Sequence, residues 1–247
     1  MERPQSISTM TRLVRRSPGT DAHSVLGDIC VLGAGIAGVS AALEAARLGR
    51  RVVLVDALPA LGGQVNLTHV QTPLEPLAAS RNALLGKAQA DLLVLHFLQS
   101  EFPEAFGSAR VRSYGLPGIR QTRWIVGRQQ LTVDDVRRGT NFADAIARTS
   151  WPIELHDRPE GYLWEAFPDD HVHYVPFGSL VPAEAANLVA VGRCIDGDSA
   201  ALSSVRVMGP CIAMGAAAAH ALDLAGSGSV AQIDVAALRR RVHDNVE

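Results

Sequence analysis

Two short apolar runs near the start of the chain flank a segment of small and apolar residues. The runs cover 28–32 and 51–56, and their length and β-branched residues predict two buried parallel strands. Between them, 39–48 has the composition of a helix that packs on a sheet, and Gly49 follows as its end. Connections this short predict a βαβ unit over 28–64 with a right-handed crossover.

The rest of the hydrophobic pattern predicts further helices and strands. After a loop over 57–81, apolar residues recur at helical spacing over 82–102, where Asn82 is the expected N-cap. Thr132 and Asp135 have the spacing of a capping box, which predicts the start of a short helix. More helices are expected over 142–148, 209–224 and 235–244, the last capped by Asp234, and strands over 153–156, 171–176 and 188–191.

These elements predict an α/β fold: a Rossmann-like parallel sheet with flanking helices. Residues 1–27 are interpreted as a flexible N-terminal tail, because their arginines are not followed by an apolar run of the signal-peptide type. Residues 28–247 are interpreted as a single domain. Its expected parts are the βαβ unit 28–64, a helical insert 82–150, a C-terminal segment 151–225 and a terminal helix 234–245.

Composition narrows the classes of protein that fit this fold. The chain has 247 residues, 47% of them hydrophobic, and a formal net charge of −2. This balance excludes a disordered protein and argues against nucleic-acid binding, because no basic excess neutralises phosphates. With only three cysteines, at 30, 194 and 211, a reducing cytoplasmic location is expected. The apolar segment 210–224 is too short to span a bilayer and predicts a buried helix.

Three glycines between the first strand and the first helix form a GxGxxG motif. Gly33 permits the tight turn, Gly35 lets a pyrophosphate approach the backbone, and Gly38 lets the helix pack close to the strand. The N-terminus of the helix then presents free N–H groups and a partial positive charge to the phosphates. Asp56, at the end of the second strand, can accept hydrogen bonds from ribose hydroxyls and repels a 2′-phosphate. Together these features predict dinucleotide binding.

A glycine pair, Gly62 and Gly63, follows Asp56 closely and is then followed by Gln64. With this pair the sequence resembles the flavoproteins with two dinucleotide-binding domains. Among them it resembles the FAD-dependent oxidoreductases that include heterodisulfide-reductase-A-like proteins. Further matching segments lie at 118–127, 131–135, 142–147, 154–157, 174–182, 187–195, 204–208 and 215–219.

The resemblance implies an FAD cofactor held from two ends of the chain. Gly192 and Arg193 would lie near the ribityl chain and pyrophosphate, while Arg206 and Gly209 would face the flavin pyrimidine. A cation or helix N-terminus there stabilises the charge of the reduced ring. The contacts implied at the N-terminal end are Gly33, Gly35, Ile36, Ala37, Gly38, Asp56, Ala57, Gly62, Gly63 and Gln64.

Family members are considerably longer, and the strands that they carry after the glycine pair have no counterpart here. This apparent internal deletion implies an abbreviated substrate region. The expected function is an FAD-dependent oxidoreductase that transfers hydride or electrons on a small-molecule substrate. One alternative is a shortened FAD-binding subunit or non-catalytic relic that needs a partner chain, and another is an NAD-dependent dehydrogenase. Exposed edges left by the deletion would be covered by a partner subunit or by self-association.

His156 and Arg120 are the candidate catalytic residues, because they lie in segments shared with the family and a cation near the flavin can hold an anionic substrate or pass a proton. His171 and His173 are spaced like a metal pair on a strand, but no further ligand is identifiable, so no metal site is predicted. The thiols of Cys194 and Cys211 are expected to be buried and unreactive.

Overall fold

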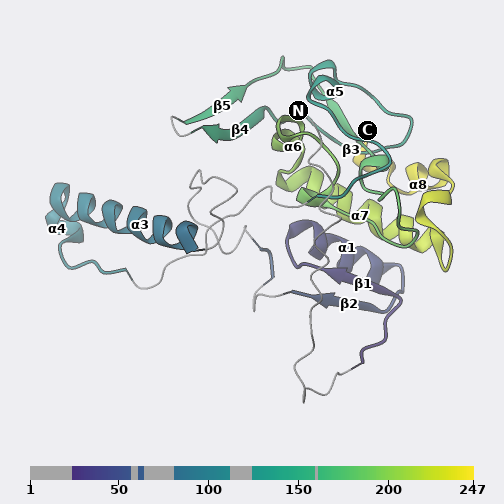
Figure 1. The fold of residues 1–247 in the computed structure, drawn as a ribbon, viewed down its shortest axis with the longest axis horizontal. Helices are drawn as coiled ribbons and strands as arrows, with labels where there is room; N and C mark the ends of the chain where they lie inside the picture. Colours follow the sequence, from purple (N-terminus) through teal and green to yellow (C-terminus); the bar gives the residue numbers. More distant parts are fainter. Residues whose placement is uncertain (1–23, 57–60, 64–80, 112–123, 159–160) are drawn as a thin grey trace.

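The computed structural model describes residues 24–56, 61–63, 81–111, 124–158 and 161–247. Strand β1 (Ile29–Leu32) pairs in parallel with β2 (Val52–Val55), and helix α1 (Ile36–Arg47) connects them, as Figure 1 shows. The predicted βαβ unit is therefore present. Its helix begins at Ile36, three residues earlier than expected, so the third glycine of the motif lies in the first helical turn.

The two parallel strands are covered on one face only, which corrects the prediction that they are buried. Ile29 packs into a small core with Ala45 and Ala219, whereas Cys30 and Leu32, on the opposite face, are exposed. Successive side chains of a strand point to opposite faces, so helices on one side bury only alternate residues. A two-stranded parallel sheet is an α/β feature, but the larger Rossmann-like sheet stays a prediction.

Helix α7 (Met208–Ala225) crosses α1 and forms the most extensive helix contact of the described chain. It carries eight buried residues, in agreement with the predicted buried helix. Among the residues that the structure describes, α7 is also the one helix long and apolar enough to cross a membrane, a test that the core helix of a soluble protein passes as well.

A second layer of short antiparallel strand pairs lies on the other side of α7 (Figure 1). Strand β3 (Ala145–Thr149) pairs with β6 (His173–Pro176), and β4 (Ile153–Arg158) pairs with β5 (Gly161–Glu165). Strands β3, β4 and β6 share the main hydrophobic core with α7 and three short helices. The short helices are α5 (Val133–Arg138), α6 (Ser199–Val205) and α8 (Val235–Arg241).

Two predicted elements in this region are wrong. The segment 142–148 is not a helix, because a turn at 143–144 leads into β3, which pairs with β6. The segment 188–191 is not a strand. Within the described residues its Ala190 N–H donates to the Leu180 carbonyl at 2.8 Å, but it joins no sheet. In both segments the availability of a pairing strand determines whether a strand forms. Local periodicity alone does not reveal whether such a partner is available.

Two helices begin where the sequence predicts, because a side chain caps the start of each. Thr132 and Asp135 form the predicted capping box of α5, and Asp234 caps α8. Helix α8 ends at Arg241, three residues before the predicted end, and a 3-10 turn follows at His243–Asn245.

Helices α3 (Arg81–Glu101) and α4 (Pro103–Phe106) pack against each other and form a helical arm. Asn82 lies inside α3 and is not its N-cap, which corrects the prediction. Neither helix shares an extensive interface with any other element of the described chain.

Candidate functional site

The glycine turn after β1 is shaped by close backbone contacts. Gly33 has φ +103° and its N–H donates to the Val55 carbonyl at 2.7 Å, which ties the turn to the end of β2. A Cβ on Gly38 would lie 1.9 Å from the Gly33 carbonyl oxygen, so this position tolerates no side chain. Among the residues that the structure describes, none lies within 4 Å of a Cβ built on Gly35. Gly33 is thus explained by its positive φ and Gly38 by packing inside the protein, whereas no residue that the structure describes explains Gly35.

In the described part of the chain, no side chain caps the N-terminus of α1. Gly35 is the N-cap residue, in an extended conformation, and supplies no side-chain acceptor. The next N–H groups, those of Ile36, Ala37 and Gly38, belong to the first turn, where a helix has no internal acceptors. Such a terminus carries a partial positive charge and binds anions.

Asp56 and the second glycine pair pack directly on the first turn. The Ala34 N–H donates to Asp56 Oδ2 at 2.5 Å, and the Gly62 N–H donates to the Ala34 carbonyl at 2.7 Å. A Cβ on Gly63 would lie 3.1 Å from Gly35 Cα. The structure therefore brings together the two glycine segments, both of which the resemblance assigns to the cofactor. It also shows a contact that the sequence did not indicate, because Asp56 accepts a hydrogen bond from the backbone of the turn. Ala57 and Gln64 lie outside the described residues.

The C-terminal half of the chain reaches the same place through the 3-10 turn η3 (Gly192–Cys194). Gly192 is buried with φ +67°, and a Cβ there would lie 3.2 Å from the Ala37 Cβ and 3.7 Å from the Cys211 Sγ. Ala37 is in the first turn of α1 and Cys211 is in the first turn of α7. The turn η3 therefore sits between the N-terminal ends of two helices.

Small residues hold α7 against α1. A Cβ on Gly215 would lie 2.3 Å from the Ala37 carbonyl oxygen, and Ser40 Oγ donates to the Ile212 carbonyl at 2.8 Å. Among the described residues, no side chain caps α7, and none lies within 4 Å of a Cβ built on the exposed Gly209 in its first turn. Ser40 was not predicted as a site residue, although its place among small residues of α1 was a signal for a close helix contact.

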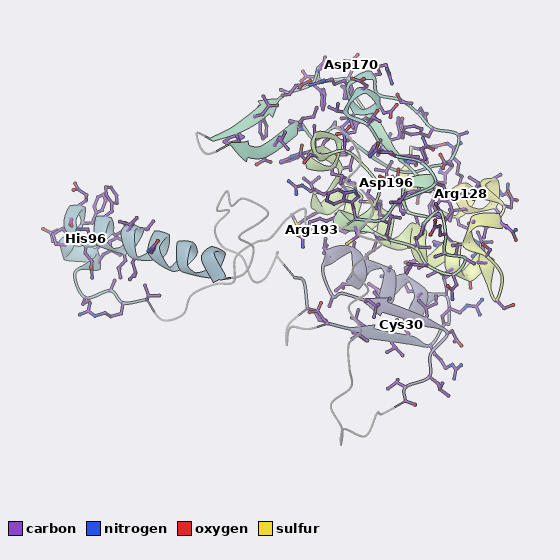
Figure 2. The ribbon with its side chains drawn as sticks, in the orientation of Figure 1. Cys30, His96, Arg128, Asp170, Arg193 and Asp196 are labelled. Atoms are coloured by element: carbon purple, nitrogen blue, oxygen red, sulfur yellow. The ribbon has the colours of Figure 1, made fainter. Side chains whose placement is uncertain are left out.

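Two arginines bring positive charge to these helix ends. Burial lowers the pKa of Arg193, which lies beside α7 in Figure 2. Burial raises the pKa of the Cys211 thiol to about 11, and the charges of Arg193 and Arg206 oppose that rise. Both guanidinium groups therefore act on the same thiol, which stays neutral at pH 7. Cys211 is buried as predicted, but Cys194 is exposed, so that prediction is wrong for it.

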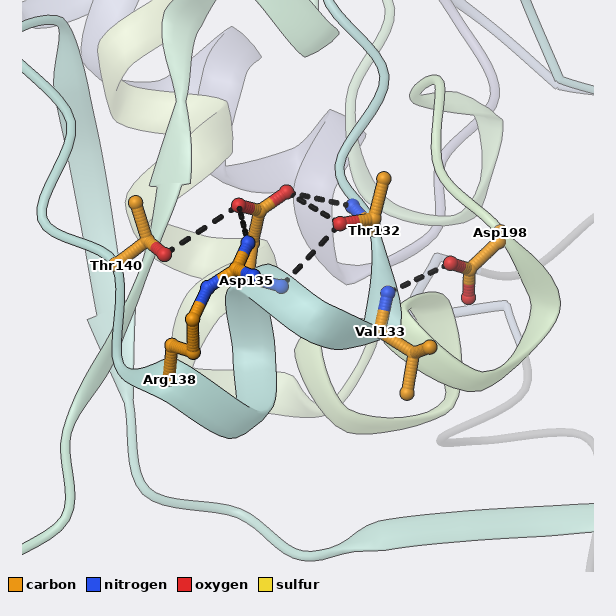
Figure 3. A network of polar contacts seen from close by, with 6 residues as sticks. All are labelled: Thr132, Val133, Asp135, Arg138, Thr140 and Asp198. Carbon is orange, nitrogen blue, oxygen red and sulfur yellow. Dashed lines mark hydrogen bonds and ion pairs between the residues drawn. The ribbon is translucent and has the colours of Figure 1, made fainter.

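A polar network holds the segment that leads to Arg206 (Figure 3). Asp198 caps α6 through the Ala201 N–H, and its other oxygen accepts from the Val133 N–H at 2.6 Å, which joins α6 to the capped start of α5. Arg206 is the C-cap residue of α6, two residues before α7. The place of this arginine thus depends on both short helices.

The two histidines considered as metal ligands form a hydrogen-bonded pair. His173 Nδ1 lies 3.2 Å from His171 Nε2, and His173 Nε2 lies 2.8 Å from Ser204 Oγ, which donates to the Trp151 carbonyl. Burial, and then His171, lowers the pKa of His173 to about 4. No group of three or more metal-ligating side chains occurs among the described residues.

The two candidate catalytic residues are not placed by the structure. Arg120 lies outside the described residues, and His156 is on β4 but its side chain is not described. Two surface hollows, of about 560 and 310 Å³, lie beside α8 and contain none of the predicted site residues. The assembled site is therefore the surface at the N-terminal ends of α1 and α7.

A βαβ unit with a glycine turn, an uncapped helix N-terminus and a carboxylate after the second strand defines a dinucleotide-binding class of protein. The model of the FAD dependent oxidoreductase family matches residues 28–94 and 74–242, and the chain belongs to that family. No curated protein and no solved structure matches the chain significantly.

Proposed function

We propose that the chain binds FAD across the N-terminal ends of α1 and α7 and acts as an FAD-dependent oxidoreductase on a small-molecule substrate. The observation that carries this proposal is the approach of Gly192 to Ala37 and Cys211, which brings two distant segments of the chain to one place. Family membership supports FAD as the dinucleotide in preference to NAD.

The residues of the site fit the diphosphate part of that cofactor. The open space at Gly35 and the uncapped N–H groups of Ile36, Ala37 and Gly38 would receive the pyrophosphate, and Gly33 holds the turn. On the adenosine side, Asp56 would face the ribose. Ala57, Gly62, Gly63 and Gln64 are proposed as its neighbours.

The flavin end would rest on the C-terminal segment. Gly192 and Arg193 would contact the ribityl chain and pyrophosphate, while Arg206 and the first turn of α7 at Gly209 would face the pyrimidine edge. FAD supplies the hydride and electron transfer when bound, and the protein supplies orientation and charge. Positive charge at that edge favours the reduced ring and raises its reduction potential.

His156 and Arg120 are proposed to act at the substrate side. A cation there would hold an anionic substrate or move a proton at the ring of the flavin. The position of His156 on β4, in the layer beyond α7, is compatible with this role.

A second candidate function is a shortened FAD-binding subunit of the heterodisulfide-reductase-A-like type that works with a partner chain. Two matched stretches that overlap at 74–94 support it, because a chain that lacks the middle of its family would match in this way. The uncovered face of the parallel sheet also supports it, since such sheets are normally covered on both faces.

The absorbance spectrum of the purified protein tests FAD binding directly. We expect a yellow protein whose visible absorbance bleaches on reduction and which releases FAD on denaturation. A colourless protein that takes up no added FAD would refute the proposal. Turnover of a small substrate by the isolated chain would support the enzyme, and turnover only after addition of a partner would support the subunit.

A further inference from the structure

The helical arm of α3 and α4 has no core of its own. No side chain described between residues 89 and 111 is buried. The exposed fractions of Leu93, Val94 and Phe97 are 69%, 58% and 57%. The contacts described within the arm are few, and include an edge-to-face pair of Phe97 and Phe102 and a hydrogen bond from Gln99 Nε2 to the Ala109 carbonyl. Apolar surface of this extent marks an interaction site.

The apolar residues of α3 do not form a single stripe. Leu92, Leu93, Val94 and Leu95 are consecutive, and at 3.6 residues per turn four consecutive residues surround most of the helix. One turn of α3, at 92–95, is therefore apolar on all sides although polar residues flank it, and such a turn is normally buried against a partner. Helix α4 covers only part of α3, so the remainder needs another partner.

The outer face of the parallel sheet is a second apolar surface, and it is only partly covered. Cys30 and Leu32 of β1 lie on the face opposite α1, and the parallel register places Val53 and Val55 of β2 beside them. Leu32 is 77% exposed and Val55 is 47% exposed. Parallel sheets in α/β proteins are covered on both faces, usually by helices.

We propose that the chain forms a symmetric dimer in which the helical arm of each copy covers the outer sheet face of the other. One surface is a helix and the other is a sheet face, and these are the two layers that pack together in α/β folds. Within one chain the arm does not lie on this face, as Figure 1 shows. Exchange of an identical element between two copies is an established route to dimers.

The apolar area is large enough for such an interface. The exposed apolar side chains of the sheet face amount to roughly 300 Å², and the arm that covers them buries a similar area, so two reciprocal contacts bury about 1,200 Å², the lower end of the range of stable interfaces. The proposal does not depend on FAD, because neither surface includes a residue of the glycine turn or of η3.

Light scattering during gel filtration tests the proposal on the full chain. We expect twice the chain mass of 26.2 kDa for the unchanged protein. Leu93→Glu on α3 and Leu32→Glu on β1 should each yield monomer at the same concentration. Leu43→Glu is the matched control, because Leu43 is 51% exposed on α1, outside both surfaces, and this variant should stay dimeric. Circular dichroism should show that all three variants remain folded.

A cross-link between two differently labelled chains tests the reciprocal geometry. In a Cys194→Ser background, one protein keeps Cys30 and the other carries Leu93→Cys with Cys30→Ser, and the two are mixed with a short bismaleimide. We expect a band of two chains that requires both proteins. A monomeric mass for the unchanged protein, a dimer unaffected by Leu93→Glu and Leu32→Glu, or no two-chain band from the mixture of the two proteins would overturn the proposal.

Discussion

At the residue scale, the three glycines of the GxGxxG motif have different structural roles. A side chain at Gly38 would overlap the Gly33 carbonyl, whereas a Cβ at Gly35 would contact none of the described residues. Packing within the protein therefore explains Gly38 but gives no reason for Gly35. A ligand that approaches the backbone does give one.

This difference predicts opposite results for two substitutions. Gly35→Val should abolish FAD binding and leave the melting temperature of the flavin-free protein nearly unchanged. Gly38→Ala should lower that melting temperature, because the added methyl lies 1.9 Å from a backbone oxygen and overpacking costs about 1–3 kcal/mol. Flavin content by absorbance and thermal unfolding by circular dichroism measure both effects. Normal flavin stoichiometry in Gly35→Val would contradict the assigned phosphate turn.

His173 makes folding stability depend on pH. Its pKa falls from 6.5 to about 4 in the fold, so the folded protein favours the neutral imidazole. The stability that depends on this group is complete above pH 6.5. It is lost as pH falls from 6.5 to 4, by up to about 3 kcal/mol.

We expect His173→Gln to flatten this dependence, because glutamine does not titrate and its amide can still donate to Ser204. Urea unfolding at a series of pH values between 4 and 7 measures the slope. His243→Gln is the control, since His243 pairs with Glu247 on the surface and should leave the slope largely in place. An equal slope in His173→Gln would assign the pH dependence to other groups.

At the element scale, the contact between α1 and α7 joins the two halves of the site. The helices approach closely because Gly215 faces the backbone of Ala37 and Ala41. Their N-terminal ends, with Arg193 and Arg206 nearby, present positive charge in one region. Any change that separates these helices should therefore affect both stability and cofactor binding.

Gly215→Ala tests this coupling. Alanine is the better helix former by about 1 kcal/mol, but its methyl would lie 2.3 Å from the Ala37 carbonyl oxygen. We expect the steric overlap to outweigh the gain in helix propensity, so that the variant has a lower melting temperature and weaker FAD binding. Gly209→Ala in the same helix meets no atom within 4 Å, so its melting temperature should be unchanged or slightly higher. Equal stability of the two variants would argue against a close contact at Gly215.

At the scale of the whole molecule, a ligand that bridges α1, η3 and α7 should stabilise the folded chain. Binding to the native state alone adds about 2.7 kcal/mol at a ligand concentration one hundred times the dissociation constant. We therefore expect added FAD to raise the melting temperature of flavin-free protein and not that of Gly35→Val. NAD should have no comparable effect, and a larger shift with NAD would favour the dehydrogenase alternative.

The sequence by itself determined the local parts of this protein. The βαβ unit, the capping box at Thr132, the cap at Asp234 and the long apolar helix α7 were predictable, because each depends on residues within one turn or one strand. The glycine pair at Gly62 and Gly63 was also visible in the sequence, whereas its contact with the first turn is seen only in the structure. Short-range sterics and hydrogen bonding fix such features wherever the segment lies.

The tertiary structure alone decided what depends on a distant partner. The segment 142–148 became β3 because β6 was available to pair with it, and Asp56 turned toward the Ala34 N–H. Likewise, strands that the sequence predicts as buried keep an exposed face, since helices cover only one side of β1 and β2. Burial and pairing are properties of two segments together, so no pattern within one segment can determine them.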